Sequence, residues 1–167
     1  MYSVGDAVFH PTNGAGVITR VERMPAIQSD LRFYKIRMSD RNETVLRVPV
    51  SKADDLGLRP ALPPEEVSQV LGILAATPGP LPEPNKDRYK ECQDRLATAE
   101  TRTLAELIRD LAWRQIVADR LNAPALRIYS QAKRLLAGEL AVSQGTTIQS
   151  AEEQIQTALQ QRPTPAL

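Results

Sequence analysis

The 167-residue chain contains few of the residues on which catalysis and metal binding usually depend. Cys92 is its single cysteine, so it cannot form an internal disulfide or build a zinc site alone. His10 is the single histidine and has no partner set for a histidine-based triad. These absences argue against an enzyme, and they predict no catalytic residues, no metal and no cofactor.

Long apolar runs are also missing. No stretch approaches the roughly 18 consecutive apolar residues of a membrane-spanning helix, and no signal-peptide core follows Met1. We therefore expect a cytoplasmic protein with no membrane partner. Aromatic residues make up only 4% of the chain, so the core must consist of leucine, isoleucine, valine and alanine.

Residues 1–52 show the period-two alternation of β-strands. On the second strand, one face is expected to carry Val17, Thr19 and Val21, and the other Ile18, Arg20 and Glu22. Residues 33–38 and 45–50 alternate in the same way, and Gly14 with Gly16 supplies the turn after the first strand. Four short strands at this spacing predict an SH3/Tudor-like β-barrel, a type of domain that more often binds partners than catalyses reactions.

The chain changes character after a connector at residues 53–62. From Pro63 onward apolar residues recur at helical spacing, so residues 63–162 predict an all-helical domain. Two threonines, Thr103 and Thr146, stand three residues before Glu106 and Gln149 and predict helix starts. The fold class is therefore expected to be α+β, with the barrel followed by a C-terminal helical domain.

The last strand of the barrel offers one candidate interaction surface. Arg47 alternates outward together with Val45 and Pro49. Proline has no backbone N–H, so Pro49 predicts that this strand lies at a sheet edge, where a partner's strand can be added. A merely solvent-exposed charge is an equally good interpretation of Arg47.

Basic residues of the helical part offer a second candidate surface. Residues 86–138 hold eleven Lys/Arg against seven Asp/Glu, a balance of +4. Lys86, Arg88 and Lys90 surround one helix start, and Arg127, Gln131 and Arg134 share a face of a later helix. Such clusters suit phosphate contacts, although a solvated helix face explains them on charge alone.

Six segments, in order along the chain, together point to a family. They read V-G-D-A-V-F-H-P-T-N-G-A-G-V-I (4–18), R-V-P (47–49), G-L-R (57–59), D-R-Y-K (87–90), A-E-L-I-R-D-L (105–111) and A-K-R-L-L-A-G-E-L-A (132–141). In combination they resemble the CarD/CdnL family of bacterial transcription regulators. The N-terminal half is also similar to the RNA-polymerase-interacting domain of the transcription-repair coupling factor.

The resemblance implies both partners and contact residues. The barrel would bind the β subunit of RNA polymerase, partly by strand pairing, through Arg47 with Val45 and Pro49, and with Arg23 as a second basic contact. The helical domain would lie against promoter DNA at the upstream edge of the transcription bubble and stabilise the open complex without sequence readout. The residues expected at the DNA are Asn85, Lys86, Arg88, Lys90, Arg127 and Arg134.

One position departs from the family pattern. Asn85 stands four residues before Tyr89, where family members usually carry a tryptophan that wedges into the minor groove. An amide cannot replace the stacking of an indole. Two other readings therefore stay open: a polymerase-bound adaptor whose helices contact another protein, and an SH3-like RNA- or ribosome-binding protein. The free protein is expected to be a monomer.

Overall fold

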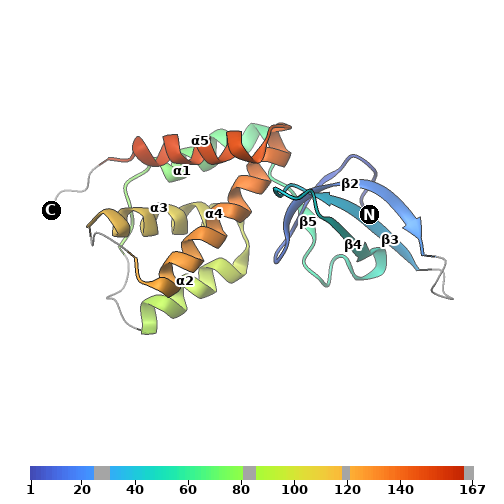
Figure 1. Ribbon diagram of the computed structural model, residues 1–167, viewed down its shortest axis with the longest axis horizontal. Helices are drawn as coiled ribbons and strands as arrows, with labels where there is room; N and C mark the ends of the chain where they lie inside the picture. Colours follow the sequence, from blue (N-terminus) through green and yellow to red (C-terminus); the bar gives the residue numbers. More distant parts are fainter. Residues whose placement is uncertain (25–30, 81–85, 118–120, 164–167) are drawn as a thin grey trace.

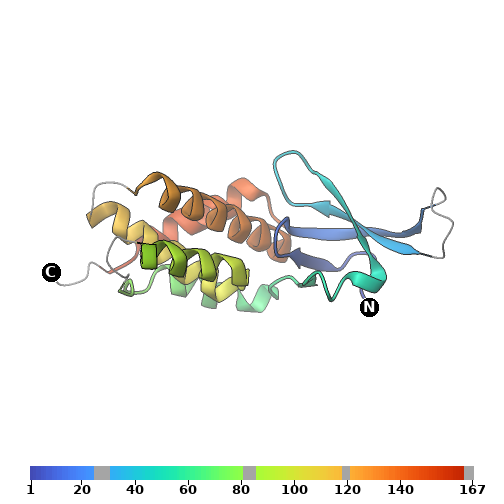
Figure 2. The same ribbon diagram turned by 90° about the horizontal axis from the view of Figure 1, so that it is seen from below.

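The computed structural model describes residues 1–24, 31–80, 86–117 and 121–163. A sheet and a group of helices lie side by side along the long axis of the molecule (Figures 1 and 2). The strands are β1 (Ala7–His10), β2 (Gly14–Arg23), β3 (Arg32–Met38), β4 (Val45–Pro49) and β5 (Arg59–Pro60). The helices are α1 (Val67–Leu74), α2 (Lys86–Thr98), α3 (Thr101–Val117), α4 (Ala123–Gln144) and α5 (Ile148–Gln160), with short 3-10 turns at Val50–Lys52 and Pro64–Glu66.

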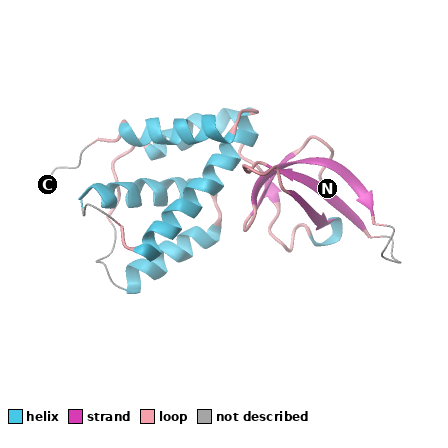
Figure 3. Cartoon of the chain, viewed as in Figure 1, coloured by secondary structure: helices cyan, strands magenta, loops and turns pink. Residues whose placement is uncertain are grey.

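The sheet is antiparallel, with strand order β4-β3-β2-β1-β5. Strands occupy one half of the molecule and α-helices the other (Figure 3), which confirms the expected α+β class. The sheet is not closed, because β4 and β5 are its two edges. The predicted barrel is therefore an open five-stranded sheet, and part of the predicted connector, Arg59–Pro60, pairs with β1 as the fifth strand.

A β-bulge in β2 changes which side chains share a face. The pairing with β3 shifts between Ile18 and Arg20, so that Thr19 is an extra residue. Ile18 is buried and Val21 packs against the same core, although simple alternation predicted opposite faces for them. The prediction that Arg20 shares a face with Ile18 is wrong, because one inserted residue reverses the alternation beyond it.

The apolar residues form two cores. The sheet core consists of Val8, Ile18, Tyr34, Ile36, Met38, Val48, Ala53 and Leu58. The larger core belongs to the five α-helices, and it also takes in Phe9 and Ala15 from the β1–β2 hairpin. Helix α4 packs against α2, α3, α5 and β2, so it is the element that joins the helices to the sheet.

The helix boundaries follow capping signals, with two shifts. Gly145 ends α4 in the left-handed region, with φ 65°, as its position predicts. Helix α5 begins one residue later than expected, with the Thr147 side chain accepting a hydrogen bond from Ser150 N. Helix α3 begins at Thr101 rather than at Thr103, and the Thr101 hydroxyl donates a hydrogen bond of 3.0 Å to the Glu139 carboxylate of α4. Among the residues described, no helix is long and apolar enough to cross a membrane.

Candidate functional site

Strand β4 presents the exposed edge that Pro49 predicted. In the described part of the chain β4 pairs with β3 alone, so its other side carries backbone groups that no strand occupies. Val45 is 43% exposed, Arg47 is also exposed, and the Val48 side chain between Arg47 and Pro49 is buried. This edge can accept an additional strand while its buried side chains hold it to the sheet core.

The face of the sheet that carries Arg47 is basic. Lys35 lies opposite Arg47 on β4 and opposite Arg20 on β2, so three cations form a row across three strands. We call this the outer face, because the buried side chains of the same strands point to the other side. Arg47 Nε donates a hydrogen bond of 3.2 Å to Glu22 Oε1, and both side chains are partly solvated. Water and salt weaken such a pair, so a partner's carboxylate can replace Glu22.

The structure does not bring Arg23 together with Arg47. Arg23 is the last residue of β2 and lies opposite Arg32 at the end of β3. Glu22, its neighbour, points to the outer face, so alternation places Arg23 on the opposite side of the strand. Arg23 is exposed, but it lies on the opposite face of the sheet from Arg47.

A buried ion pair joins the sheet to the helices, and the sequence did not predict it. The Arg59 guanidinium of β5 makes two hydrogen bonds to the Glu139 carboxylate of α4, with N–O distances of 2.7 and 3.2 Å. Thr101 Oγ1, at 3.0 Å, and the Leu62 backbone N–H, at 2.9 Å, also donate to this fully buried carboxylate. Arg59 additionally donates to the Ala99 carbonyl at 2.8 Å. The buried charge is thus fully hydrogen-bonded, as a buried carboxylate requires.

Two close contacts complete this junction. The Arg59 guanidinium lies 4.1 Å from the centre of the Phe9 ring, a cation–π contact between two strands of the sheet. Gly138, next to Glu139, lets α4 approach the β3–β4 turn, since a Cβ there would lie 3.2 Å from the Ser39 carbonyl oxygen. The junction therefore fixes how β4 and the helical domain are oriented relative to each other.

The sequence did contain a signal for the junction. Glu139 is the one charged residue within the apolar run L-L-A-G-E-L-A, at a position whose neighbours are all buried. A carboxylate on the core face of a helix needs a buried cation or several donors. Identifying Arg59 as that cation requires the three-dimensional contact, because the two residues are 80 positions apart.

The predicted basic residues of the helical domain lie on α2 and along α4. Helices α2 and α4 pack together, and their first turns lie at the end away from the sheet (Figures 1 and 2). Lys90 and Arg127 are exposed near the starts of α2 and α4, whereas Arg134 is exposed halfway along α4, where it lines a groove together with Arg41 of the β3–β4 turn. Lys86 begins α2, and Asn85 lies outside the described residues.

Arg88 is oriented differently from the other cations of this group. Its side chain is half-buried, with Nη2 shielded from solvent, and it lies near the buried Cys92 thiol. It is therefore less accessible to a partner than Lys90. Burial raises the pKa of Cys92, which fits its prediction as a core residue. Within the described ranges, no group of three or more His, Cys, Asp or Glu side chains is arranged to hold a metal ion.

Comparison with known proteins agrees with this two-part organisation. The family model described as "CarD-like/TRCF RID domain" matches residues 2–62, and that described as "CarD, C-terminal domain" matches residues 69–156. The chain belongs to the CarD family. YdeB of Bacillus subtilis (strain 168), whose name proposes a role as a transcription factor, is a relative with 32% identity over 147 residues, which cover 88% of this chain and 95% of YdeB.

Membership of the CarD family gives the two halves their general roles. The protein is a transcription regulator, and its N-terminal sheet domain is of the type that interacts with RNA polymerase. The R-V-P and G-E-L-A segments that suggested the family from sequence now have physical meanings. The first forms the free edge at β4, and the second supplies Gly138 and Glu139 at the junction.

Proposed function

We propose that this CarD-family protein binds the β subunit of RNA polymerase through the edge of β4 and stabilises promoter open complexes through its helical domain. The observation that carries the proposal is the free edge of β4 with Arg47 on the outer face beside it. Strand addition would supply backbone hydrogen bonds, and side chains that alternate along the strand would supply specificity.

Charge favours an acidic contact beside the added strand. Arg20, Lys35 and Arg47 form a cationic row, and Glu22 is paired with one of them. A carboxylate on the polymerase that reaches Arg47 would exchange one solvated ion pair for another in a less hydrated setting, where the pair is stronger. Arg47 therefore contributes more to binding than to folding.

The position of the helical domain supports the DNA half of the proposal. The junction at Glu139 holds α4, and α2 packed against it, at a set position relative to β4, so polymerase binding would also place Lys90, Arg127 and Arg134. Lysine and arginine on helix surfaces contact phosphates without reading bases. DNA contact by the free protein should accordingly be weak, salt-dependent and indifferent to sequence.

The polymerase half is tested with a charge reversal at the edge strand. Arg47→Glu should weaken binding to isolated β subunit by about 2 kcal/mol or more, because it places like charges at the contact. Arg102→Glu, an exposed reversal on α3, is the matched control and should bind as the wild type does. Equal affinity of the Arg47 variant and the wild type would remove β4 from the interface.

The DNA half is tested by the lifetime of promoter open complexes challenged with heparin. The wild type should lengthen this lifetime, and Arg134→Glu should shorten it while leaving polymerase binding intact. If the protein binds polymerase but leaves the lifetime unchanged, the helical domain serves as an adaptor for another protein. The polymerase and DNA contacts are thus separated by two independent measurements.

A further inference from the structure

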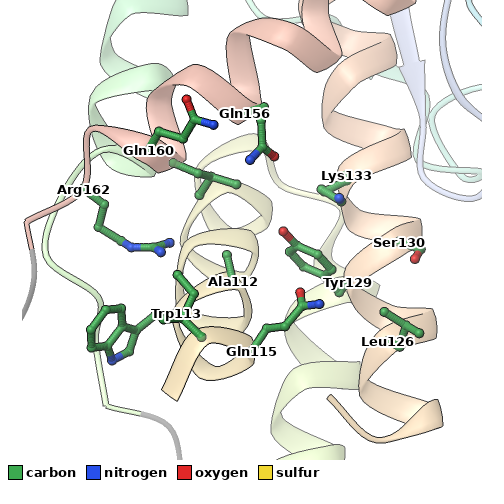
Figure 4. A pocket seen from close by; sticks show the side chains of 12 residues that line it. Ala112, Trp113, Gln115, Leu126, Tyr129, Ser130, Lys133, Gln156, Gln160 and Arg162 are labelled. Atoms are coloured by element: carbon green, nitrogen blue, oxygen red, sulfur yellow. The ribbon is translucent and has the colours of Figure 1, made fainter. Parts of the chain in front are cut away.

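A cavity of about 780 Å³ opens between α3, α4 and α5, on the helical domain and apart from β4 (Figure 4). Its walls carry two aromatic rings, two cations and several amides. Those used below are Trp113, Gln115, Tyr129, Lys133, Gln156 and Arg162. The volume is within the range of roughly 300–1,000 Å³ that is usual for small-molecule sites.

The cavity is positively charged. Lys133 and Arg162 belong to its lining, and none of the lining residues that the structure describes is acidic. Lys133 Nζ lies 4.3 Å from the centre of the Tyr129 ring, and the Arg162 guanidinium lies 5.6 Å from that of Trp113. Among the residues that the structure describes, Arg162 donates one hydrogen bond, to the Arg109 carbonyl at 3.4 Å, and a guanidinium has five N–H groups.

The Asp110 carboxylate, whose charge acts on Arg162, is already hydrogen-bonded to two other arginines. Asp110 is buried, accepts hydrogen bonds from Arg95 at 3.2 Å and Arg109 at 2.8 Å, and also accepts the Gly79 N–H at 2.9 Å. Burial lowers the pKa of Arg162, a sign that its charge is poorly solvated where it lies. An anion entering the cavity would compensate this excess positive charge.

The two cations enter the cavity from opposite sides in Figure 4, with the Tyr129 hydroxyl and the Gln156 amide between them. A ligand with a single negative group cannot use both sides equally. A ligand with a flat ring and either a chain of phosphates or phosphates at both ends can reach both cations, and its ring can lie against Tyr129 or against Trp113, which Figure 4 shows on different sides of α3. The amides of Gln115 and Gln156 each offer a donor and an acceptor, as the edge of a nucleobase does.

We propose that this cavity binds a nucleotide unit, with its phosphates at Lys133 and Arg162 and its base against the aromatic side chains. The same unit occurs in a nucleoside triphosphate and in an unpaired strand of DNA. In the proposed function, DNA would lie close to this cavity, because the proposed DNA contacts Arg127 and Arg134 flank its α4 wall. The site itself is independent of the contact between β4 and polymerase.

Trp113 is the single tryptophan of the chain, so its fluorescence reports on this cavity. The free full-length protein is titrated with GTP, guanosine, inorganic tripolyphosphate, single-stranded oligodeoxythymidine and the corresponding duplex. Calorimetry in parallel detects binding that leaves the emission unchanged. We expect saturable binding of GTP, the single strand or both, and at least about tenfold weaker binding of guanosine and tripolyphosphate, each of which lacks half of the contacts.

Two variants locate the bound ligand. Lys133→Met and Arg162→Gln should each weaken binding about tenfold, because each removes one charge-assisted contact. Lys52→Met, an exposed change in the sheet domain, is the matched control and should bind normally. Binding of GTP alone identifies a free nucleotide as the ligand, and binding of the single strand alone identifies unpaired DNA.

Three results would overturn the proposal. They are no binding by either method, tripolyphosphate binding as tight as that of GTP, and an affinity that neither Lys133→Met nor Arg162→Gln changes. The experiment contains no polymerase, so its failure leaves the Arg47→Glu result untouched. If Arg47→Glu leaves polymerase binding unchanged, the proposed nucleotide site is in turn unaffected.

Discussion

Two of the arginine–glutamate pairs that connect distant parts of this chain, the junction pair and the outer-face pair, differ in how much water reaches them. In the junction pair, Glu139 is fully buried and the Arg59 side chain is 31% exposed. In the outer-face pair, the Arg47 side chain is 44% exposed and that of Glu22 is 23% exposed. The junction carboxylate also accepts hydrogen bonds from Thr101 and Leu62.

The difference between these pairs separates stability from recognition. A buried carboxylate that loses its cation is left with an uncompensated charge in a medium of low dielectric constant. An exposed pair that loses one member is rehydrated at little cost. The same two residue types therefore hold the two domains together at Glu139 and remain available to a partner at Arg47.

The largest expected effect follows from removing the cation of the junction. Arg59→Met should lower the free energy of unfolding by about 3 to 5 kcal/mol, because Glu139 stays buried and charged without its partner. Glu139→Gln should cost less, about 1 to 2 kcal/mol, since Arg59 is partly exposed and can be hydrated. Urea denaturation of both variants checks this order, and equal costs would contradict it.

A second change tests the junction without touching a charge. Gly138→Val should lower the free energy of unfolding by about 2 kcal/mol, because a branched side chain would force α4 away from the Ser39 carbonyl. Gly72→Val on α1 is the control for helix propensity, since a Cβ there meets no atom within 4 Å. If both valine variants lose the same stability, the approach of α4 to the sheet is not tight.

In contrast to the junction, the outer-face pair should contribute little to the free energy of unfolding. Arg47→Met and Glu22→Gln should each change the free energy of unfolding by about 0.5 kcal/mol or less. Glu22→Gln frees Arg47 for a partner, so it should leave polymerase binding intact or tighten it a few-fold, by up to about 1 kcal/mol. Weaker polymerase binding by Glu22→Gln would show that Glu22, rather than Arg47 alone, touches the partner.

The same contrast explains what the sequence could and could not predict. The edge position of β4 followed from Pro49 and from the alternation around Arg47, both of which are local. The junction depends on residues 80 positions apart, and Arg59 lies in a two-residue strand too short to show any period. Local patterns therefore identified the exposed candidate site and missed the buried one.

A smaller error, at Arg20, and the partial burial of Arg88 have the same origin. The bulge at Thr19 moved Arg20 to the outer face, and nothing in the alternation of β2 marked where the extra residue would fall. Arg88 stays a predicted phosphate contact, but its position four residues before Cys92 places it on the same helix face as that core residue, and its side chain is half-buried. Helical spacing therefore predicted the partial burial of Arg88, which its charge alone did not.

The smallest expected effect concerns His10, whose turn adjoins the junction rather than the outer face. His10 Nδ1 accepts hydrogen bonds of 3.2 Å from the backbone N–H groups of Thr12 and Asn13. The next residue, Gly14, begins β2, and a Cβ there would lie 3.6 Å from Leu135 Cδ2 of α4. A change in this turn should therefore be felt at α4 and not at β4.

Burial lowers the pKa of His10 from its ordinary value of 6.5, so the folded protein favours the neutral ring. The contribution of His10 to stability should be complete above that value and lost as the pH falls through the lower pKa of the folded state. Protonated Nδ1 cannot accept a hydrogen bond, so acid should loosen the turn. NMR titration of this single histidine gives its pKa directly, and His10→Gln is the control whose stability should lack this step. A pKa at or above 6.5, or acid-induced shifts centred on β4 rather than on residues 10–14, would show that the turn is not coupled to the junction.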